Sequence, residues 1–187
     1  MEKRNKSKMI GIYNKIMIHK KISLSIVHIG RNIKNTLEKA IANEIEGKCI
    51  IEGFVKPNSV KILTYSSGVL NSYNVVYDVV LECLICSPVE GQIISCVIKN
   101  ITETAGIKAE VDDTPSPLII YLARDHHYNV PEFNKLNIDE NINVKVIGQR
   151  YELNDKYVSV IGELIKEKPE YINKQKKPSK PRLVIEE

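Results

Sequence analysis

The first quarter of the chain changes from an alternating pattern of apolar and polar residues to a pattern with helical spacing. Apolar and polar residues roughly alternate across Ile10–Ile29, which is typical of extended structure. From Asn32 onward, apolar residues recur every four positions while charged residues occupy the other face. This spacing predicts one amphipathic helix of about three turns. Its apolar face consists of Ile33, Leu37, Ile41 and Ile45.

After Gly47 the pattern becomes strand-like, because β-branched residues dominate and Gly, Pro and Ser residues interrupt them. Three strands are predicted here, at Cys49–Val55, Val60–Tyr65 and Val75–Cys86. The last of them is nearly continuous in apolar residues, which predicts that it is buried on both faces.

Pro88–Gly91 is the best candidate for an internal boundary, since proline cannot donate to a sheet ladder and glycine permits a turn. Beyond it, the polar stretch Arg124–Glu140 separates three predicted strands from two more, and Asn154-Asp155 supplies a turn between the last two. Five short strands interrupted after the third are in the order of an OB-type barrel. The five are Gln92–Thr102, Gly106–Val111, Pro117–Ala123, Ile142–Leu153 and Lys156–Ile165.

The predicted fold class is therefore α+β, with one helix on an antiparallel sheet followed by a five-stranded OB-type β-barrel. The predicted division is a flexible basic arm at residues 1–9, an N-terminal α/β domain at 10–88, the OB domain at 89–165 and a basic tail at 166–187. The tail is rich in Lys, Asn, Gln and Pro, a composition that favours disorder until a partner binds.

Charge is unevenly distributed along the 187 residues, whose formal net charge is +4. The basic residues gather near the two ends, whereas Val89–Ile165 carries seven Lys or Arg against twelve Asp or Glu, a formal −5. This weakens the inference from a basic chain to general binding of nucleic-acid backbone. We identify no secretory signal and no apolar run long enough to span a bilayer, so we expect an intracellular, reducing compartment.

Two groups of residues could in principle hold a metal ion. Cys83 and Cys86 form a C-x-x-C motif, but a second such pair is missing and residues three apart on a strand face opposite sides. Asp112-Asp113 and Asp125-His126-His127 could meet at one end of the barrel, although loop carboxylates and imidazoles are ordinarily solvated. We predict no metal, no cofactor and no catalytic residue, since no Gly-rich phosphate loop or nucleophile motif is present either.

RNA binding by the barrel would need basic side chains and stacking aromatics on one face. Stacking on an aromatic side chain contributes about 1–3 kcal/mol per base, so a single well-placed tyrosine would matter. The alternative is a solvated surface, which the net negative charge of this half favours. The candidates are Lys99, Lys108, Tyr121, Arg124, Lys145 and Arg150.

A series of short motifs, taken in order, resembles the family that contains the E-prime stalk protein of archaeal RNA polymerase and the seventh subunit of the eukaryotic polymerases. That family has a V-E-G-x-C segment after the first helix, a P-x-x-G-E segment between its halves and a K-I-x-G…A-I-G hairpin at the end of its barrel. The corresponding segments here are Ile45–Cys49 leading into Gly53–Val55, then Pro88–Gln92, and finally Val144–Arg150 with Val158–Gly162. The resemblance covers about Ile10–Ile165.

The resemblance implies a non-catalytic stalk subunit of a DNA-directed RNA polymerase. In this family the N-terminal tip domain docks on the largest polymerase subunits near the clamp, the OB domain lies near nascent RNA, and a smaller helical subunit packs against both. The implied docking candidates are Glu46, Gly47, Pro57, Asn58, Ser66, Ser67 and Gly68. The abundance of Ile, Lys and Asn suggests an AT-rich genome, such as that of a large DNA virus or a protist, and hence a nucleus, a viral factory or a virion as location.

Two departures from the family pattern bear on these expectations. Asp112–Pro117 replaces a Gly-Pro turn, and Gly106–Ala109 carries Ile and Ala where RNA-binding relatives often place aromatics. The RNA role is weakened by this, whereas the docking role is not. The main alternative is a free-standing OB-fold RNA-binding protein in translation or RNA decay. A metal-dependent nuclease built on Asp112, Asp113, His126 and His127 is a more distant alternative.

Overall fold

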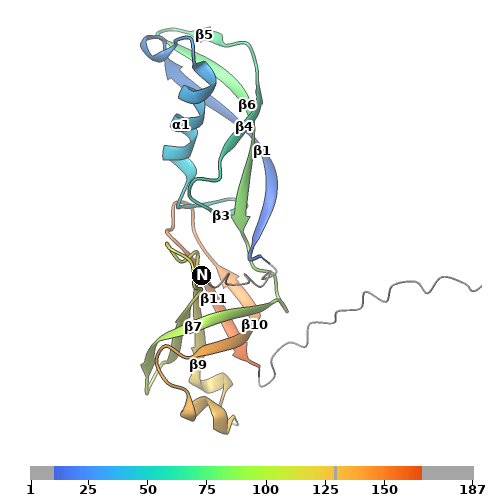
Figure 1. The fold of residues 1–187 in the computed structure, drawn as a ribbon, viewed down its shortest axis with the longest axis vertical. Helices are drawn as coiled ribbons and strands as arrows, with labels where there is room; N and C mark the ends of the chain where they lie inside the picture. The colour runs from blue at the N-terminus through green and yellow to red at the C-terminus, as the bar shows by residue number, and fades with distance from the viewer. Residues whose placement is uncertain (1–10, 129, 166–187) are drawn as a thin grey trace, which may run out of the picture.

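A computed structural model describes residues 11–128 and 130–165. Figure 1 shows a sheet with one helix at one end of the molecule and a β-barrel at the other. The predicted fold class, one helix on an antiparallel sheet followed by a closed five-stranded barrel, is confirmed. The predicted basic arm at 1–9 and basic tail at 166–187 lie outside the described residues.

The N-terminal sheet is organised around its longest central strand, β6 (Asn74–Cys86). The strand β1 (Tyr13–Ser25) pairs with β6 along its whole length, with Tyr13 opposite Cys86 and Ser25 opposite Asn74. The other side of β6 pairs with three short strands in succession, and all of these pairings are antiparallel. They are β5 (Val69–Asn71), β4 (Lys61–Tyr65) and β3 (Gly53–Val55), the last of which also pairs with β2 (Cys49–Ile50).

The helix α1 (Ile33–Ile45) covers one face of this sheet, and its bounds match the four-residue spacing of the sequence. Leu37, Ile41 and Ile45 are buried against the sheet. A helix of this length is marginal alone, so its stability depends on packing, at about 1.5–3 kcal/mol for each large apolar side chain buried. The short 3-10 helix η1 (Ile26–His28) links β1 to the loop before α1.

The predicted strand Cys49–Val55 is divided into β2 and β3 by a turn at residues 51–52. Gly53 ends this turn with a φ of 132°, a conformation that side chains strongly disfavour. A Cβ atom at this position would lie 2.6 Å from the carbonyl oxygen of Cys86. Glycine is therefore required where β3 meets the end of β6, which gives the Gly53–Val55 motif a structural reason.

The prediction that Val75–Cys86 is buried on both faces is wrong for most of its length. Residues that face α1, such as Val79, Leu81 and Cys83, are buried, whereas Val80 on the opposite face is half-buried and Asp78 is exposed. Within residues 11–128 and 130–165 only one face of the sheet is covered, and the apolar run reflects β-branched residues on the other face. Open faces of this kind are common in antiparallel sheets.

The barrel contains five strands in the closed order β10-β11-β9-β8-β7, and β9 and β11 are its one parallel pair. The strands are β7 (Ile93–Thr102), β8 (Gly106–Glu110), β9 (Leu118–Ala123), β10 (Asn141–Arg150) and β11 (Val158–Leu164). The predicted interruption after the third strand holds two 3-10 helices, η2 (Arg124–His126) and η3 (Pro131–Lys135). A Cβ atom at Gly162 of β11 would meet Val144 and the carbonyl of Lys145, so this glycine permits the close pairing of β11 and β10.

Two hydrophobic clusters form the core. One lies between α1 and the N-terminal sheet. The other fills the barrel with side chains such as Ile98, Ile120 and Val144, and it extends to Phe54 and Cys86 of the N-terminal sheet. Apolar packing is therefore continuous across the predicted boundary at Pro88–Gly91.

Candidate functional site

One outer face of the barrel gathers part of the predicted RNA-binding set. Tyr121 on β9 and Arg150 at the end of β10 line a single shallow groove of about 420 Å³. Lys108 lies directly opposite Tyr121 in the β8–β9 register, and Ile161 lies opposite it on β11. Tyr121 is 41% exposed, so its ring is accessible from this groove. Lys108 and Tyr121 thus lie on the paired strands β8 and β9, and β11 separates Tyr121 from Arg150 on β10.

The other three predicted RNA-binding residues lie apart from this groove or are held by local contacts. Lys99 pairs with Asp139 at 3.3 Å. Arg124 donates to the carbonyl of Glu103 and, at 3.3 Å, to the side chain of Asn134. Lys145 lies opposite Ile93 and Glu163 on the far part of β10. The two cations near Tyr121 also have acidic neighbours, with Lys108 at 3.1 Å from Glu110 and Arg150 at 3.4 Å from Glu152.

Four of the predicted docking residues form one group below the C-terminal end of α1. The Glu46 carboxylate accepts hydrogen bonds from the backbone N–H groups of Asn58 at 2.9 Å, Ser59 at 3.1 Å and Val60 at 3.0 Å. Gly47 has a φ of 70°, and a Cβ atom there would lie 3.9 Å from Pro57. Glu46, Gly47, Pro57 and Asn58 therefore build the turn that leads into β4.

The remaining docking residues, Ser66, Ser67 and Gly68, lie in the β4–β5 loop toward the opposite end of the sheet. Ser66 is held to β6 by two bonds, from its N–H to the Asp78 carbonyl at 2.9 Å and from the Asp78 N–H to its Oγ at 3.0 Å. The structure separates the seven predicted docking residues into two groups at different ends of the N-terminal sheet.

Exposed apolar side chains gather at this far end of the sheet, and none of them is among the residues predicted from the sequence. They come from η1, β5 and the β5–β6 turn, and a hydrogen bond of 3.1 Å from the Ile26 N–H to the Tyr73 carbonyl joins these segments. Val27 and Tyr73 are both 84% exposed. We call this surface the distal patch, and it consists of Ile26, Val27, Val69, Leu70 and Tyr73. The sequence does contain one indication of this surface. The apolar Val69-Leu70 pair directly before the turn residues Asn71-Ser72 is typical of a hairpin whose tip is exposed.

A set of hydrogen bonds joins the N-terminal sheet to the barrel. The Cys49 N–H donates to the Asp155 carbonyl at 2.7 Å, and the Asn154 N–H donates to the Cys49 carbonyl at 2.9 Å. The Tyr151 hydroxyl donates to the Ile51 carbonyl at 2.9 Å. The loop between β10 and β11 is therefore bonded directly to β2 and the turn that follows it, which orients the barrel relative to the sheet.

An ion pair adds a second link between the two parts. Lys56 lies 3.1 Å from the Asp113 carboxylate, and its ammonium group is 4.3 Å from the centroid of the Tyr13 ring. Partial burial tends to raise the pKa of Asp113, but hydrogen bonds from Lys56 and Tyr13 and the charge of Lys56 outweigh it and lower that pKa. Burial, followed by the nearby Asp113 charge, raises the pKa of Tyr13. Asp113 of the barrel thus stabilises the junction with the N-terminal sheet through Lys56 and Tyr13.

The cysteines considered as metal ligands are buried among apolar side chains. Cys83 belongs to the cluster beneath α1 and Cys86 to the barrel cluster, as expected for residues on opposite sides of a strand. Burial raises the pKa of Cys83 to about 11 and that of Cys86 to about 12. The apolar surroundings thus favour the protonated thiol at both positions, as is common for buried structural cysteines.

His127 has a structural role that corrects the expectation of a solvated loop imidazole. It is 2% exposed and stacks on Phe133, with 4.7 Å between ring centroids. Its Nδ1 lies 2.7 Å from the Ala123 carbonyl, and its Nε2 accepts the Leu164 N–H at 2.9 Å. Both ring nitrogens are thus used within the fold, and across residues 11–128 and 130–165 no group of three or more His, Cys, Asp or Glu is placed to hold a metal ion.

Comparison with known proteins identifies a viral homologue. No model of a known protein family matches the chain. A protein of Acanthamoeba polyphaga mimivirus, named "Putative DNA-directed RNA polymerase subunit", is 26% identical over 172 residues, which cover 83% of each chain. The two proteins are distant homologues. A match of this extent includes both the N-terminal sheet and the barrel of the present chain. Within the described part of the chain, no helix has the length and apolar character needed to cross a membrane.

Proposed function

We propose that this chain is a non-catalytic subunit of a viral-type, multisubunit DNA-directed RNA polymerase, acting as its stalk. The observation that carries the proposal is the homology to a viral protein of that name across both parts of the chain. The sheet-plus-barrel architecture supports it, because this is the architecture implied by the resemblance to stalk subunits. The proposed site of action is a viral factory, a virion or the nucleus.

The proposed docking surface toward the largest polymerase subunits is the distal patch. Five exposed apolar side chains lie at this end of the sheet, on both of its faces because Val69 and Leu70 are successive strand residues. Exposed apolar groups of this kind commonly mark interaction sites. Covering each of them would contribute up to about 1.5–3 kcal/mol. Ser66, Ser67 and Gly68 border the patch through the β4–β5 loop, while the group around Glu46 lies at the other end and is a second, smaller contact.

The proposed second role is contact with nascent RNA through the groove of Tyr121 and Arg150, with Lys108 opposite Tyr121 on β8. The exposed tyrosine ring offers a stacking surface. The cations lie on the strands to either side of it, Lys108 on β8 and Arg150 on β10 beyond β11, and they would contact phosphates on either side of a stacked base. Lys99, Arg124 and Lys145 contribute less in this proposal because they lie elsewhere or are held by local contacts. A smaller helical subunit remains a proposed partner of the stalk.

The decisive experiment is affinity purification of the tagged chain, in the infected or native host cell, with partners identified by mass spectrometry. The wild-type chain should recover the two largest polymerase subunits in near-equal amounts. Val27→Asp combined with Tyr73→Asp should reduce that recovery at least about tenfold, because charged side chains would be desolvated in the interface. Ile138→Asp is the matched control, since this apolar residue is 59% exposed but lies outside the distal patch.

The same purification distinguishes the second candidate function, a free-standing RNA-binding protein in translation or RNA decay. The groove around Tyr121 is the observation that favours it. Recovery of ribosomes, or of RNA without polymerase subunits, would replace the stalk proposal by this one. Equal recovery of polymerase by wild type and the Val27→Asp, Tyr73→Asp variant would instead remove the distal patch as the docking surface.

A further inference from the structure

The strand β1 leaves one long edge of the N-terminal sheet without a partner in the described part of the chain. It is 13 residues long and bonds to β6 on one side only. A free edge presents unpaired N–H and C=O groups and is a template for pairing with another extended chain. The barrel has no such edge because its five strands close on themselves.

The hydrogen bonds around β6 identify which backbone groups of β1 point outward. Asp78 and Leu84 accept from Ser66 and Lys56 on the β4 side, so even-numbered residues of β6 turn away from β1. Odd-numbered β6 residues therefore bond to even-numbered β1 residues, and the Ile26 N–H to Tyr73 carbonyl bond continues this alternation. The groups directed outward belong to Lys15, Met17, His19, Lys21 and Ser23.

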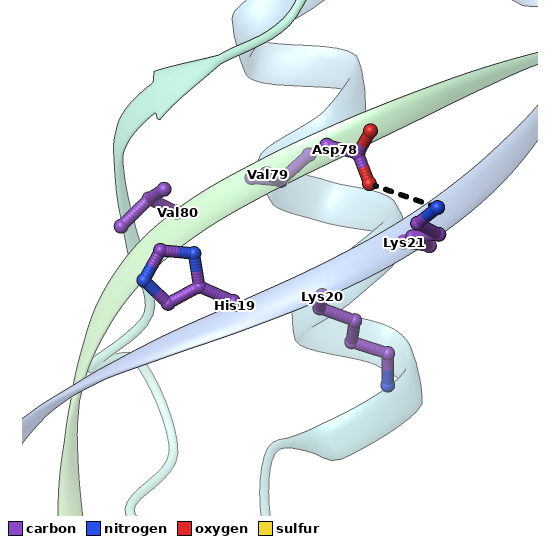
Figure 2. A pocket seen from close by; sticks show the side chains of 6 residues that line it. All are labelled: His19, Lys20, Lys21, Asp78, Val79 and Val80. Carbon is purple, nitrogen blue, oxygen red and sulfur yellow. Dashed lines mark ion pairs between the residues drawn. The ribbon is translucent and has the colours of Figure 1, made fainter.

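The side chains of these outward residues lie on the open face of the sheet and are mainly basic. Figure 2 shows Lys21 paired with Asp78 across β1 and β6, with His19 beside Val80. Lys21 lies 3.6 Å from Asp78, and Lys15 lies 2.9 Å from Glu82. Both lysine side chains are largely exposed, so these ion pairs are weak and leave the two ammonium groups accessible to an added chain. A chain added beside β1 would have Lys15, His19 and Lys21 as its nearest neighbours on this face.

The other face of β1 borders a groove lined by both apolar and charged side chains. This groove, of about 370 Å³, lies beside the C-terminal end of α1 and includes residues from both parts of the molecule. Its apolar lining includes Ile18 of β1 and the strongly exposed Ile51 and Leu153. Its charged lining consists of Lys20, Glu44 and Glu52, so apolar rather than acidic side chains suit this face. Alternate side chains of an added strand on this face would reach the groove, because successive side chains of a strand point to opposite faces.

We propose that β1 binds an extended segment of a partner protein as an additional strand, and that this segment alternates apolar and acidic residues. Its apolar side chains would enter the groove of Ile18, Ile51 and Leu153, and its acidic side chains would lie beside Lys15 and Lys21. Main-chain hydrogen bonds supply the affinity in this mode of recognition, and the alternate side chains supply the specificity. This mode of binding involves the edge of β1 and does not depend on membership of a polymerase.

A second copy of this chain is a poorer occupant. Two β1 strands paired antiparallel about His19 would place His19 against His19 and bring Lys15 and Lys21 of both copies onto one face. Like charges in neighbouring strands destabilise a sheet pairing. The charge of the edge therefore favours an acidic partner segment over self-association.

The test uses the full chain and two synthetic peptides, one alternating Ile with Glu and the other alternating Ile with Lys, with hydrogen exchange followed residue by residue. The Ile/Glu peptide should slow exchange at Lys15, Met17, His19, Lys21 and Ser23 by at least about tenfold, the response expected of newly formed backbone hydrogen bonds. Exchange at Ile18, Lys20 and Ile22, which already bond to β6, should change little. The Ile/Lys peptide should have no such effect.

Two sets of variants sharpen the test. Met17→Pro removes an outward N–H without removing a bond to β6, so it should weaken peptide binding at least about tenfold while Met17→Ala does not. Lys15→Glu combined with Lys21→Glu should reverse the preference toward the Ile/Lys peptide. Unchanged exchange at the five outward amides with both peptides overturns the proposal. Protection that rises with protein concentration in the absence of peptide, together with a dimer in size-exclusion chromatography, overturns it in favour of self-association.

Discussion

The N-terminal sheet and the barrel bury their β-strands in different ways, one as an open sheet and the other as a closed ring. The barrel closes on itself, so its backbone groups are paired around the ring and its core is enclosed. In the described part of the chain, α1 covers one face of the sheet, and the other face, the outer edge of β1 and the distal patch stay uncovered. Exposed apolar side chains and an unpaired strand edge, which can bind partners, are therefore concentrated in the first half of the described chain. The barrel has a shallow groove on its closed outer surface.

The two parts are not fully independent, because they share a core at their junction. Phe54 is fully buried and belongs to the barrel cluster although it lies on β3 of the sheet. The closed part therefore depends on a side chain supplied by the open part. Substitutions can measure how far this dependence extends, beginning with the largest expected effect.

Phe54→Ala should destabilise both parts at once, by about 3–5 kcal/mol, because it leaves a cavity in a core to which both contribute. Leu37→Ala is the matched control, since Leu37 is equally buried but belongs only to the cluster beneath α1. Denaturant unfolding followed by hydrogen exchange in each part would measure this. If Phe54→Ala left exchange in the barrel unchanged, the shared core would not couple the two parts.

Gly162→Ala should destabilise the barrel by about 1–3 kcal/mol, because the added methyl group would overlap Val144 in a closed and tightly packed ring. Gly148→Ala on the neighbouring strand β10 is the control, since a Cβ atom there has no neighbour within 4 Å. The midpoint of denaturant unfolding is the measurement. Equal midpoints for the two variants would show that β10 and β11 can separate to accommodate the methyl group. The barrel would then not be a more tightly closed structure than the sheet.

The elements governed by local spacing could be predicted from the sequence. The helix Ile33–Ile45 follows from the recurrence of one apolar residue every four positions, and the five barrel strands follow from their turn signals. The division of Cys49–Val55 was missed because it depends on how closely Gly53 approaches Cys86. The burial of Val75–Cys86 was overestimated because an apolar strand gives the same pattern whether or not its second face is covered.

Features that depend on residues distant in the sequence could not be predicted. The bonds of Cys49 to Asn154 and Asp155 join segments about a hundred positions apart, and nothing in either segment marks the other. The burial of His127 could not be predicted because it requires both Phe133 and the end of β11. For the candidate site, residue type identified Tyr121 and Arg150, but only the strand order shows that they share a groove and that Lys99 and Lys145 do not.

The smallest predicted effect concerns the Lys56–Asp113 link between sheet and barrel. Because the folded state lowers the pKa of Asp113, the stabilisation is fully present above the unfolded pKa of about 3.9 and is lost as pH falls through the lower folded value. Asp113→Asn should therefore cost up to about 1 kcal/mol at neutral pH, and this difference from wild type should shrink below about pH 4. Urea unfolding across that pH range would measure this loss of stability.

Asp112→Asn is the control, because it removes the same charge from a neighbouring position. Its free energy of unfolding should differ less from that of the wild type at neutral pH. Equal effects of the two substitutions at every pH would mean that net charge, rather than the contact between sheet and barrel, accounts for the change.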